Sequence, residues 1–355
     1  MKHGRSLQEL AVEIERQAKT KEDFIADTRK IQMDSFKDDS GTVSSSIVFA
    51  GNSFDVNSIA HSQIAEKLKI PYKYYERMRT ETPHLLDSNV NTWLNVNPSR
   101  RMVRTLDGTA RAFLSEKYRR IDNYEIAQEV LPIIADMDGA TVESCEITDS
   151  KMYLKVVNPK VQTEVVKGDI VQSGLVISNS EVGMGSVSVM PLIYRLVCSN
   201  GMIAADHGVR KFHVGRANEV DDDYKVYASD TIVADERAFM MKLRDVIKAT
   251  TEIANFEKIV GMMKEATHAK IVSADVPEVV KLASRDYGIL ESESEGVLNH
   301  LIRNEDLSLY GLVNAVTRQA QDVESYDRST SLEIIAFDML GMSRAAWNKI
   351  NAVTV

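Results

Sequence analysis

The sequence predicts an α+β protein: a mostly antiparallel β core with one crossing helix, flanked by N-terminal helices and a C-terminal helical domain. Between Trp93 and Val233, strand-like segments dominate and surround a single helical stretch. After Ala234, apolar residues recur about every four positions, as on one face of a helix. At 355 residues and 44% hydrophobic content, the chain is long enough to bury a sizeable core.

The first 45 residues are expected to form an N-terminal helical segment and a linker. Apolar residues recur at helical spacing from Ser6 to Asp27, including Phe24 and Ile25. Small polar residues then fill 34–46, as is typical of a loop.

The second expected domain is an α+β core over 46–233, and the third is a helical domain over 234–355. The core begins with a short strand and two short helices within 57–79, which break before Pro71 because the residue preceding a proline disfavours the helical conformation. One helix is expected over 124–137. Alternating apolar residues predict strands at 100–106, 109–118, 141–147, 151–157, 173–179, 186–197 and 210–215.

The amino-acid composition excludes several classes of protein. The sequence has no run of 18 apolar residues and no apolar signal-peptide core, so we expect no membrane association and a cytoplasmic location. The only cysteines are Cys145 and Cys198, which fits a reducing compartment. We expect no cofactor. A net charge of −9 excludes a protein that is basic all over, but it leaves room for a local basic surface.

The hairpin around Asp107 and Gly108 places two arginines together. Asp-Gly between strand-like segments predicts a two-residue turn, and that register sets Arg104 opposite Arg111. Alternation then puts Phe113 on the same face as both arginines. Like charges directly opposite each other in a sheet are destabilising, so this pair requires an anion.

The anion is either an internal carboxylate or a ligand phosphate, and the sequence leaves both open. From Arg100 to Arg120 there are seven basic residues against two acidic ones, which favours an external polyanion. Aromatic side chains beside them would suit single-stranded nucleic acid. The candidate nucleic-acid-binding residues are Arg101, Arg104, Arg111, Phe113, Lys117, Tyr118, Arg119, Arg120 and Arg195.

Arg195 belongs to a second informative stretch, 178–201. Gly183 and Gly185 there suit either a loop whose amides approach phosphates or a tight structural turn. Arg195 sits in an apolar strand and requires a partner, which is a ligand anion or a structural ion pair.

Three further patterns have structural alternatives that we favour. The helices within 57–79 have the pattern of a helix-turn-helix, but a helix pair packed on a sheet gives the same pattern and is the interpretation that we favour. Cys198, His207 and His213 match no compact zinc spacing, and the carboxylates at 221–223 fit a solvated loop. We therefore expect no bound metal and assign no catalytic residue.

Three segments together resemble one family. The stretches "RTLDGTARAFLSEKYRRIDN", "SNSEVGMGSVSVMPLIYRLVCSNGM" and "LYGLVNAVTRQA" are similar to the phage- and plasmid-borne family known as domain of unknown function 932. The resemblance runs from about Ile59 to Thr317. It implies a mobile-element setting and supplies no catalytic residues.

The leading hypothesis is a non-catalytic protein that binds or anneals single-stranded DNA in recombination or replication. Proteins of this class can assemble as a ring or filament of identical subunits. One alternative is an acidic interaction factor that imitates DNA or binds a host enzyme. Another is a metal-dependent nuclease.

Overall fold

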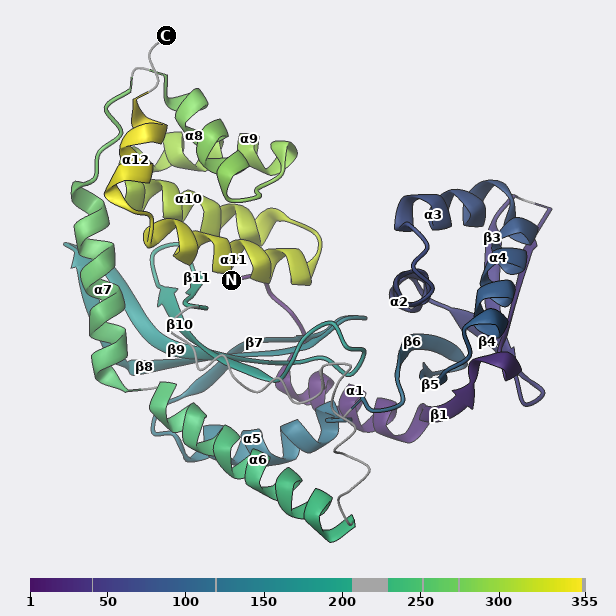
Figure 1. Ribbon diagram of the computed structural model, residues 1–355. Coiled ribbons are helices and arrows are strands. Elements are labelled where there is room, and N and C mark those ends of the chain that lie inside the picture. The colour runs from purple at the N-terminus through teal and green to yellow at the C-terminus, as the bar shows by residue number, and fades with distance from the viewer. Residues whose placement is uncertain (40, 119, 206–228, 251, 274, 353–355) are drawn as a thin grey trace.

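The computed structural model describes residues 1–39, 41–118, 120–205, 229–250, 252–273 and 275–352. The protein is α+β, as the sequence predicts, with strands in two separate sheets and a helical region at the C-terminal end (Figure 1). Among the described residues, no helix has the length and apolar character needed to cross a membrane.

The first sheet, together with three helices, forms a unit that we call the first unit. Its strand order is β1-β5-β6-β4-β3-β2, and all neighbours are antiparallel except β4 and β6. The strands are β1 (Lys21–Asp27), β2 (Gln32–Lys37), β3 (Val43–Phe49), β4 (Asn52–Val56), β5 (Arg100–Leu106) and β6 (Thr109–Ser115). The helices are α2 (Ser58–Lys67), α3 (Tyr72–Glu81) and α4 (Pro83–Val96), preceded by the short 3-10 turn η1 (Thr28–Lys30).

The N-terminal helix is shorter than the sequence predicts. Helix α1 (Leu7–Thr20) ends at Thr20, and the chain continues as the edge strand β1. In a strand, Phe24 and Ile25 point to opposite faces. Phe24 packs against aromatic rings in the core of the first unit, whereas Ile25 is exposed. Because β2 also precedes residue 46, the division expected at 45 runs through the first sheet.

Helix α4 covers the other edge of the first sheet. The side-chain amide of Asn91 both accepts from the N–H and donates to the C=O of Met33 in β2. The carboxylate of Asp87 accepts from the N–H and hydroxyl of Ser35. These side chains occupy backbone groups that an edge strand would otherwise offer to another chain.

The second unit is a layered structure. Its antiparallel sheet has the order β11-β10-β9-β8-β7. One face carries α1, α5 and α6, whose apolar side chains form a single core with the sheet, and helices of the C-terminal region cover the other face (Figure 1). The strands are β7 (Thr141–Ile147), β8 (Met152–Val166), β9 (Asp169–Asn179), β10 (Ser188–Arg195) and β11 (Asn200–Ile203). The helices are α5 (Asn123–Asp136), α6 (Ser229–Thr250), α7 (Ile253–His268), α8 (Val276–Asp286), α9 (Glu291–Asn304), α10 (Leu309–Asp322), α11 (Tyr326–Leu340) and α12 (Arg344–Asn351).

The chain path inserts the first unit into the second. Helix α1 packs on the second sheet through Leu10 and Ile14, the chain then leaves to build the first sheet, and it returns at α5 beside α1. The expected helix over 124–137 and the helical C-terminal region are confirmed. The strand expected at 210–215 lies outside the described residues, and β11 is a strand that the sequence pattern did not predict.

The insertion makes α1 a structural part of the second unit. Leu10 is 1% exposed and packs in the core of the second unit, whereas Val12 on the same helix is 69% exposed. Replacing Leu10 by Ala should lower the free energy of unfolding by about 2–5 kcal/mol, because it leaves a cavity. Val12→Ala is the matched control and should change it little. Chemical denaturation of both variants measures this, and equal effects would contradict the assignment of α1.

Candidate functional site

The predicted hairpin turn is present. Asp107 and Gly108 both have positive φ angles, 51° and 78°, as a two-residue turn that follows the twist of the strands requires. The Asp107 carboxylate accepts two hydrogen bonds from Arg16 of α1, at 2.9 and 2.7 Å. The tip of the hairpin is thereby tied to the second unit.

The predicted register holds for only two residue pairs. Leu106 pairs with Thr109, and Thr105 pairs with Ala110, but Arg104 pairs with Ala112 because a β-bulge makes Arg111 an extra residue. The prediction that Arg104 faces Arg111 is therefore wrong. One extra residue also moves every later side chain to the opposite face. Phe113 lies opposite Val103 in the core of the first unit, not on a basic surface.

Arg104 is enclosed by internal acceptors. Its guanidinium is 0% exposed and lies 2.7 Å from Asp23 and 2.7 Å from Asp122. It also donates to the backbone carbonyl of Glu181 at 2.8 Å. An arginine that is fully enclosed in this way is unable to contact a ligand phosphate without a change of fold.

Arg111 pairs with Glu181, the residue whose backbone carbonyl accepts from Arg104. Its guanidinium donates to the carboxylate of Glu181 at 2.5 Å, and the other carboxylate oxygen accepts from the backbone N–H of Asn123 at 2.6 Å. Both arginines thus converge on Glu181, and the missing anion is an internal carboxylate. We call Arg104, Arg111, Asp23, Asp122 and Glu181 the ionic junction, because they join the two units.

In the ionic junction, burial and the neighbouring opposite charges shift the pKa values of the charged groups in opposite directions. Burial alone would raise the pKa of the Asp122 carboxyl, but Arg104 and Lys21 offset this and hold that pKa below its ordinary value. Burial would lower the pKa of Arg104, whereas Asp122 and Asp23 raise it overall, so its charge persists. The junction is an ion-paired cluster in the folded state.

The glycine loop between β9 and β10 is part of this junction. Ser180 O accepts from the hydroxyl of Tyr118, and Val182 O accepts from the side chain of Gln63 in α2. Gly183 has φ +76°, and a Cβ there would approach Leu114 to 2.7 Å. The glycine therefore allows the loop to lie close against the first unit, which is the structural alternative to a phosphate loop.

The other predicted binding residues do not form one surface. Arg195 pairs with Asp169 at 2.7 Å, so it has the structural ion pair. Arg101 and Lys117 are partly buried and have partners, Tyr118 is partly buried, and Arg119 lies outside the described residues. Arg120 is exposed, with Asp23 at 3.4 Å. Of the nine, Arg120 alone among those described presents an exposed cationic side chain.

Helix α2 packs on the first sheet, and α3 packs against α2 and α4. Tyr75 of α3 and His61 of α2 are buried and hydrogen-bonded at 2.8 Å. Burial lowers the pKa of His61 to about 3, with the charge of Arg79 as a second cause. This arrangement matches the structural alternative to a helix-turn-helix.

The metal-like patterns fall mostly outside the described residues. His207, His213 and the carboxylates at 221–223 are among the residues that are not described, and the sulfur of Cys198 accepts a hydrogen bond from Arg195 at 3.3 Å. Within the described ranges, no group of three or more His, Cys, Asp or Glu side chains could hold a metal ion.

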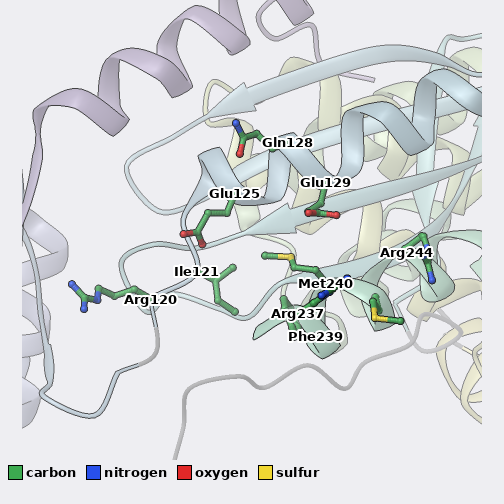
Figure 2. Close-up of a pocket in the computed structure, with 10 residues that line it drawn as sticks. Arg120, Ile121, Glu125, Gln128, Glu129, Arg237, Phe239, Met240 and Arg244 are labelled. Atoms are coloured by element: carbon green, nitrogen blue, oxygen red, sulfur yellow. The ribbon is translucent and has the colours of Figure 1, made fainter. Parts of the chain in front are cut away.

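A pocket between α5 and α6 gathers exposed arginines (Figure 2). Its volume is about 570 Å³, and we call it the arginine pocket. Arg237 and Arg244 come from α6, while Glu125 and Glu129 come from the facing side of α5 (Figure 2). Its lining residues are Arg120, Ile121, Glu125, Gln128, Glu129, Arg237, Phe239, Met240, Met241 and Arg244.

The arginine pocket adjoins the ionic junction. Arg120 lines the pocket and also lies beside Asp23. Glu125 lines it too and accepts from the N–H of Asp122 at the start of α5. Arg237 and Arg244 were not among the predicted binding residues, although they stand seven residues apart on a helix whose apolar stripe the sequence reveals. That spacing places both on one face, beside the buried stripe.

The family comparison matches part of the chain. The family model described as "Domain of unknown function (DUF932)" matches residues 112–353, so it begins inside β6 and covers most of the second unit. No curated protein and no solved structure matches the chain.

The ionic junction predicts a large loss of stability on removal of Arg104. Arg104→Ala should lower the free energy of unfolding by about 3–5 kcal/mol, because it leaves Asp23 and Asp122 charged and mostly buried. Arg16→Ala removes an arginine that is 42% exposed and should cost less than about 1 kcal/mol. Thermal and chemical denaturation compare them. A level or raised Tm for Arg104→Ala would contradict the internal pairing.

His61 predicts a pH dependence of stability. The ordinary pKa of 6.5 applies in the unfolded chain, and the folded value is about 3, so only the unfolded state binds this proton between them. The contribution to stability is complete above 6.5 and is lost progressively as the pH falls towards 3. His61→Gln should flatten the fall in unfolding free energy across that window, and His84→Gln, at an exposed position, should not. An unchanged pH profile in His61→Gln would refute this.

Proposed function

The chain belongs to the DUF932 family, whose description gives no function, and from the chemistry of the arginine pocket we propose that it is a non-catalytic binding protein for single-stranded DNA. The setting that we propose is recombination or replication; the family resemblance implies only that the protein belongs to a mobile element. The single observation that carries the proposal is the set of three arginines around one pocket. The ionic junction has a structural role instead.

The geometry of α6 suits a phosphate backbone. Arg237 and Arg244 are two helical turns apart, so their Cα atoms are separated by about 10 Å along the helix axis. Two guanidinium groups at that separation can contact different phosphates of one strand. Guanidinium groups bind phosphate oxygens through paired hydrogen bonds. Arg120, at the junction end of the pocket, adds a third cation.

The pocket also offers apolar surface to bases. Met240 and Met241 line it, and Met241 is 50% exposed. Thioether sulfur makes favourable contacts with aromatic rings and adapts to their shape. This role replaces the one expected for Phe113, which is buried. Sequence-independent binding needs such contacts together with backbone charges.

The overall charge of −9 is compatible with this function. Association with a polyanion follows the local field of the binding surface more than the total charge. The acidic remainder would confine DNA to the pocket and weaken binding elsewhere on the protein.

A second candidate is a protein-interaction factor, which a pocket of mixed apolar and charged lining between α8 and α9 favours. That pocket has a volume of about 470 Å³ and is lined in part by Val280, Leu282, Ile289 and Leu298. The apolar part of such a pocket can accept a side chain of a partner protein. It becomes the leading candidate if no oligonucleotide binds at low salt.

Removal of the two α6 arginines should weaken DNA binding. Because a charge-assisted hydrogen bond contributes about 1.5–3 kcal/mol, Arg237→Ala/Arg244→Ala should lower the affinity for a labelled single strand at least about tenfold. The slope of log affinity against log salt should fall by about 0.7 for each phosphate that is no longer neutralised by an arginine. Fluorescence anisotropy of the full chain at several salt concentrations measures both.

The matched control is Lys242→Ala, which removes a charge from the flank of α6 that does not line the pocket. It should leave affinity and salt slope nearly unchanged. Equal losses in the control and in the arginine variants would contradict a specific site, and wild-type protein that binds no oligonucleotide would reject the function.

A further inference from the structure

The arginine pocket has two chemically different walls. Glu129 lies on the side of α5 that is turned towards α6, from which Arg237 and Arg244 come, and Gln128 of α5 also lines the pocket (Figure 2). A simple phosphate groove would have no reason to place carboxylates opposite its cations, because they repel the same ligand. The carboxylates of the α5 wall are therefore expected to contact a part of the ligand other than its phosphate.

Glu129 is the carboxylate with most freedom to contact a ligand. It is exposed, and it makes no hydrogen bond or ion pair within the part of the chain that the structure describes. Glu125 differs, because its carboxylate caps the start of α5 by accepting from the N–H of Asp122. On the α6 wall, Arg244 forms an ion pair, among the described residues, only with Asp245, the next residue in the chain, at 3.4 Å.

The two walls do not neutralise each other. Among the described residues, Glu129 forms no ion pair with Arg237 or Arg244, although all three line the pocket. A ligand that fits both walls carries negative charge on one side and hydrogen-bond donors on the other. A nucleotide has this polarity, with phosphate at one end and, in some bases, an exocyclic amino group at the other.

We infer that the α5 wall selects bases that carry an exocyclic amino group, so that the pocket binds cytosine-containing single strands in preference to thymine-containing ones. This inference rests on the proposed function. Glu129 accepts a hydrogen bond from the N4 amino group of cytosine. Thymine offers a carbonyl oxygen where cytosine offers the amino group, and that oxygen would face a carboxylate.

The size of the pocket agrees with this ligand. Pockets that hold small ligands have volumes of about 300–1,000 Å³, and about 570 Å³ falls within this range. A base between the walls would lie against Met240, with its phosphate on the α6 side. The strand would therefore be held by charge along α6 and distinguished by hydrogen bonds along α5.

The test compares short oligo-dC and oligo-dT, at mildly alkaline pH so that cytosine stays neutral, by anisotropy with the full chain. Wild-type protein should bind oligo-dC about fivefold or more tightly than oligo-dT. Glu129→Ala should reduce that ratio to about one. Its affinity for oligo-dT should stay level or rise, since a charge that repels phosphate is removed. Asp136→Ala, an exposed carboxylate on α5 outside the pocket, is the control and should keep the wild-type ratio.

The possible failures are distinguishable. If both strands bind equally well to the wild type but affinity still depends on Arg237 and Arg244, the base selection is wrong and the proposed function stands. If Glu129→Ala raises affinity for both strands and keeps their ratio, the carboxylate only repels phosphate, and the inference is again overturned. If neither strand depends on the arginines, the proposed function fails and the inference fails with it.

Discussion

The buried guanidinium of Arg104 is the interaction on which the arrangement of the two units depends. The first unit has its own apolar core, and the second unit has its own apolar clusters, so among the described residues no buried apolar cluster extends across both. What joins them is polar: Arg104 contacts Asp23 of its own sheet, Asp122 at the start of α5, and the loop carbonyl of Glu181. Buried ion pairs contribute little net stability over apolar packing, but they tolerate few other geometries. The junction therefore fixes orientation more than it adds stability.

This polar connection also reaches the arginine pocket. Asp122 caps α5, whose next turns present Glu125 and Glu129 to the pocket, and Asp23 lies beside Arg120 at its edge. The position of α5 relative to α6 is thus set at one end by the contacts between the units. Packing of α6 on α5 through residues such as Phe239 and Leu243 sets the remainder. The two walls of the pocket are thus placed by contacts that lie outside the pocket itself.

Local signals in the sequence predicted local structure well. The turn at Asp107 and Gly108, the strand ends beside it, the helix over 124–137 and the helical C-terminal region all follow from spacing and turn chemistry. The bulge at Arg111 could not be predicted this way, because its arginine is directed by Glu181, which is 70 positions away in the sequence. Because of this one extra residue, Phe113 lies in the core of the first unit and not on the expected binding face. The arginine pocket was missed because Arg120 and Arg237 are brought together only by the packing of α6 against α5.

The insertion of the first unit brings the two points where the chain crosses between the units close together. Lys21, where the chain leaves the second unit, forms an ion pair with Asp122, where it has returned, so the two crossing points are adjacent. A unit whose ends lie together can be gained, lost or exchanged during evolution with only a short bridge across the gap. The family match begins at residue 112, after most of that unit has passed. The family model therefore covers the second unit from α5 onward and includes only the end of β6 from the first unit.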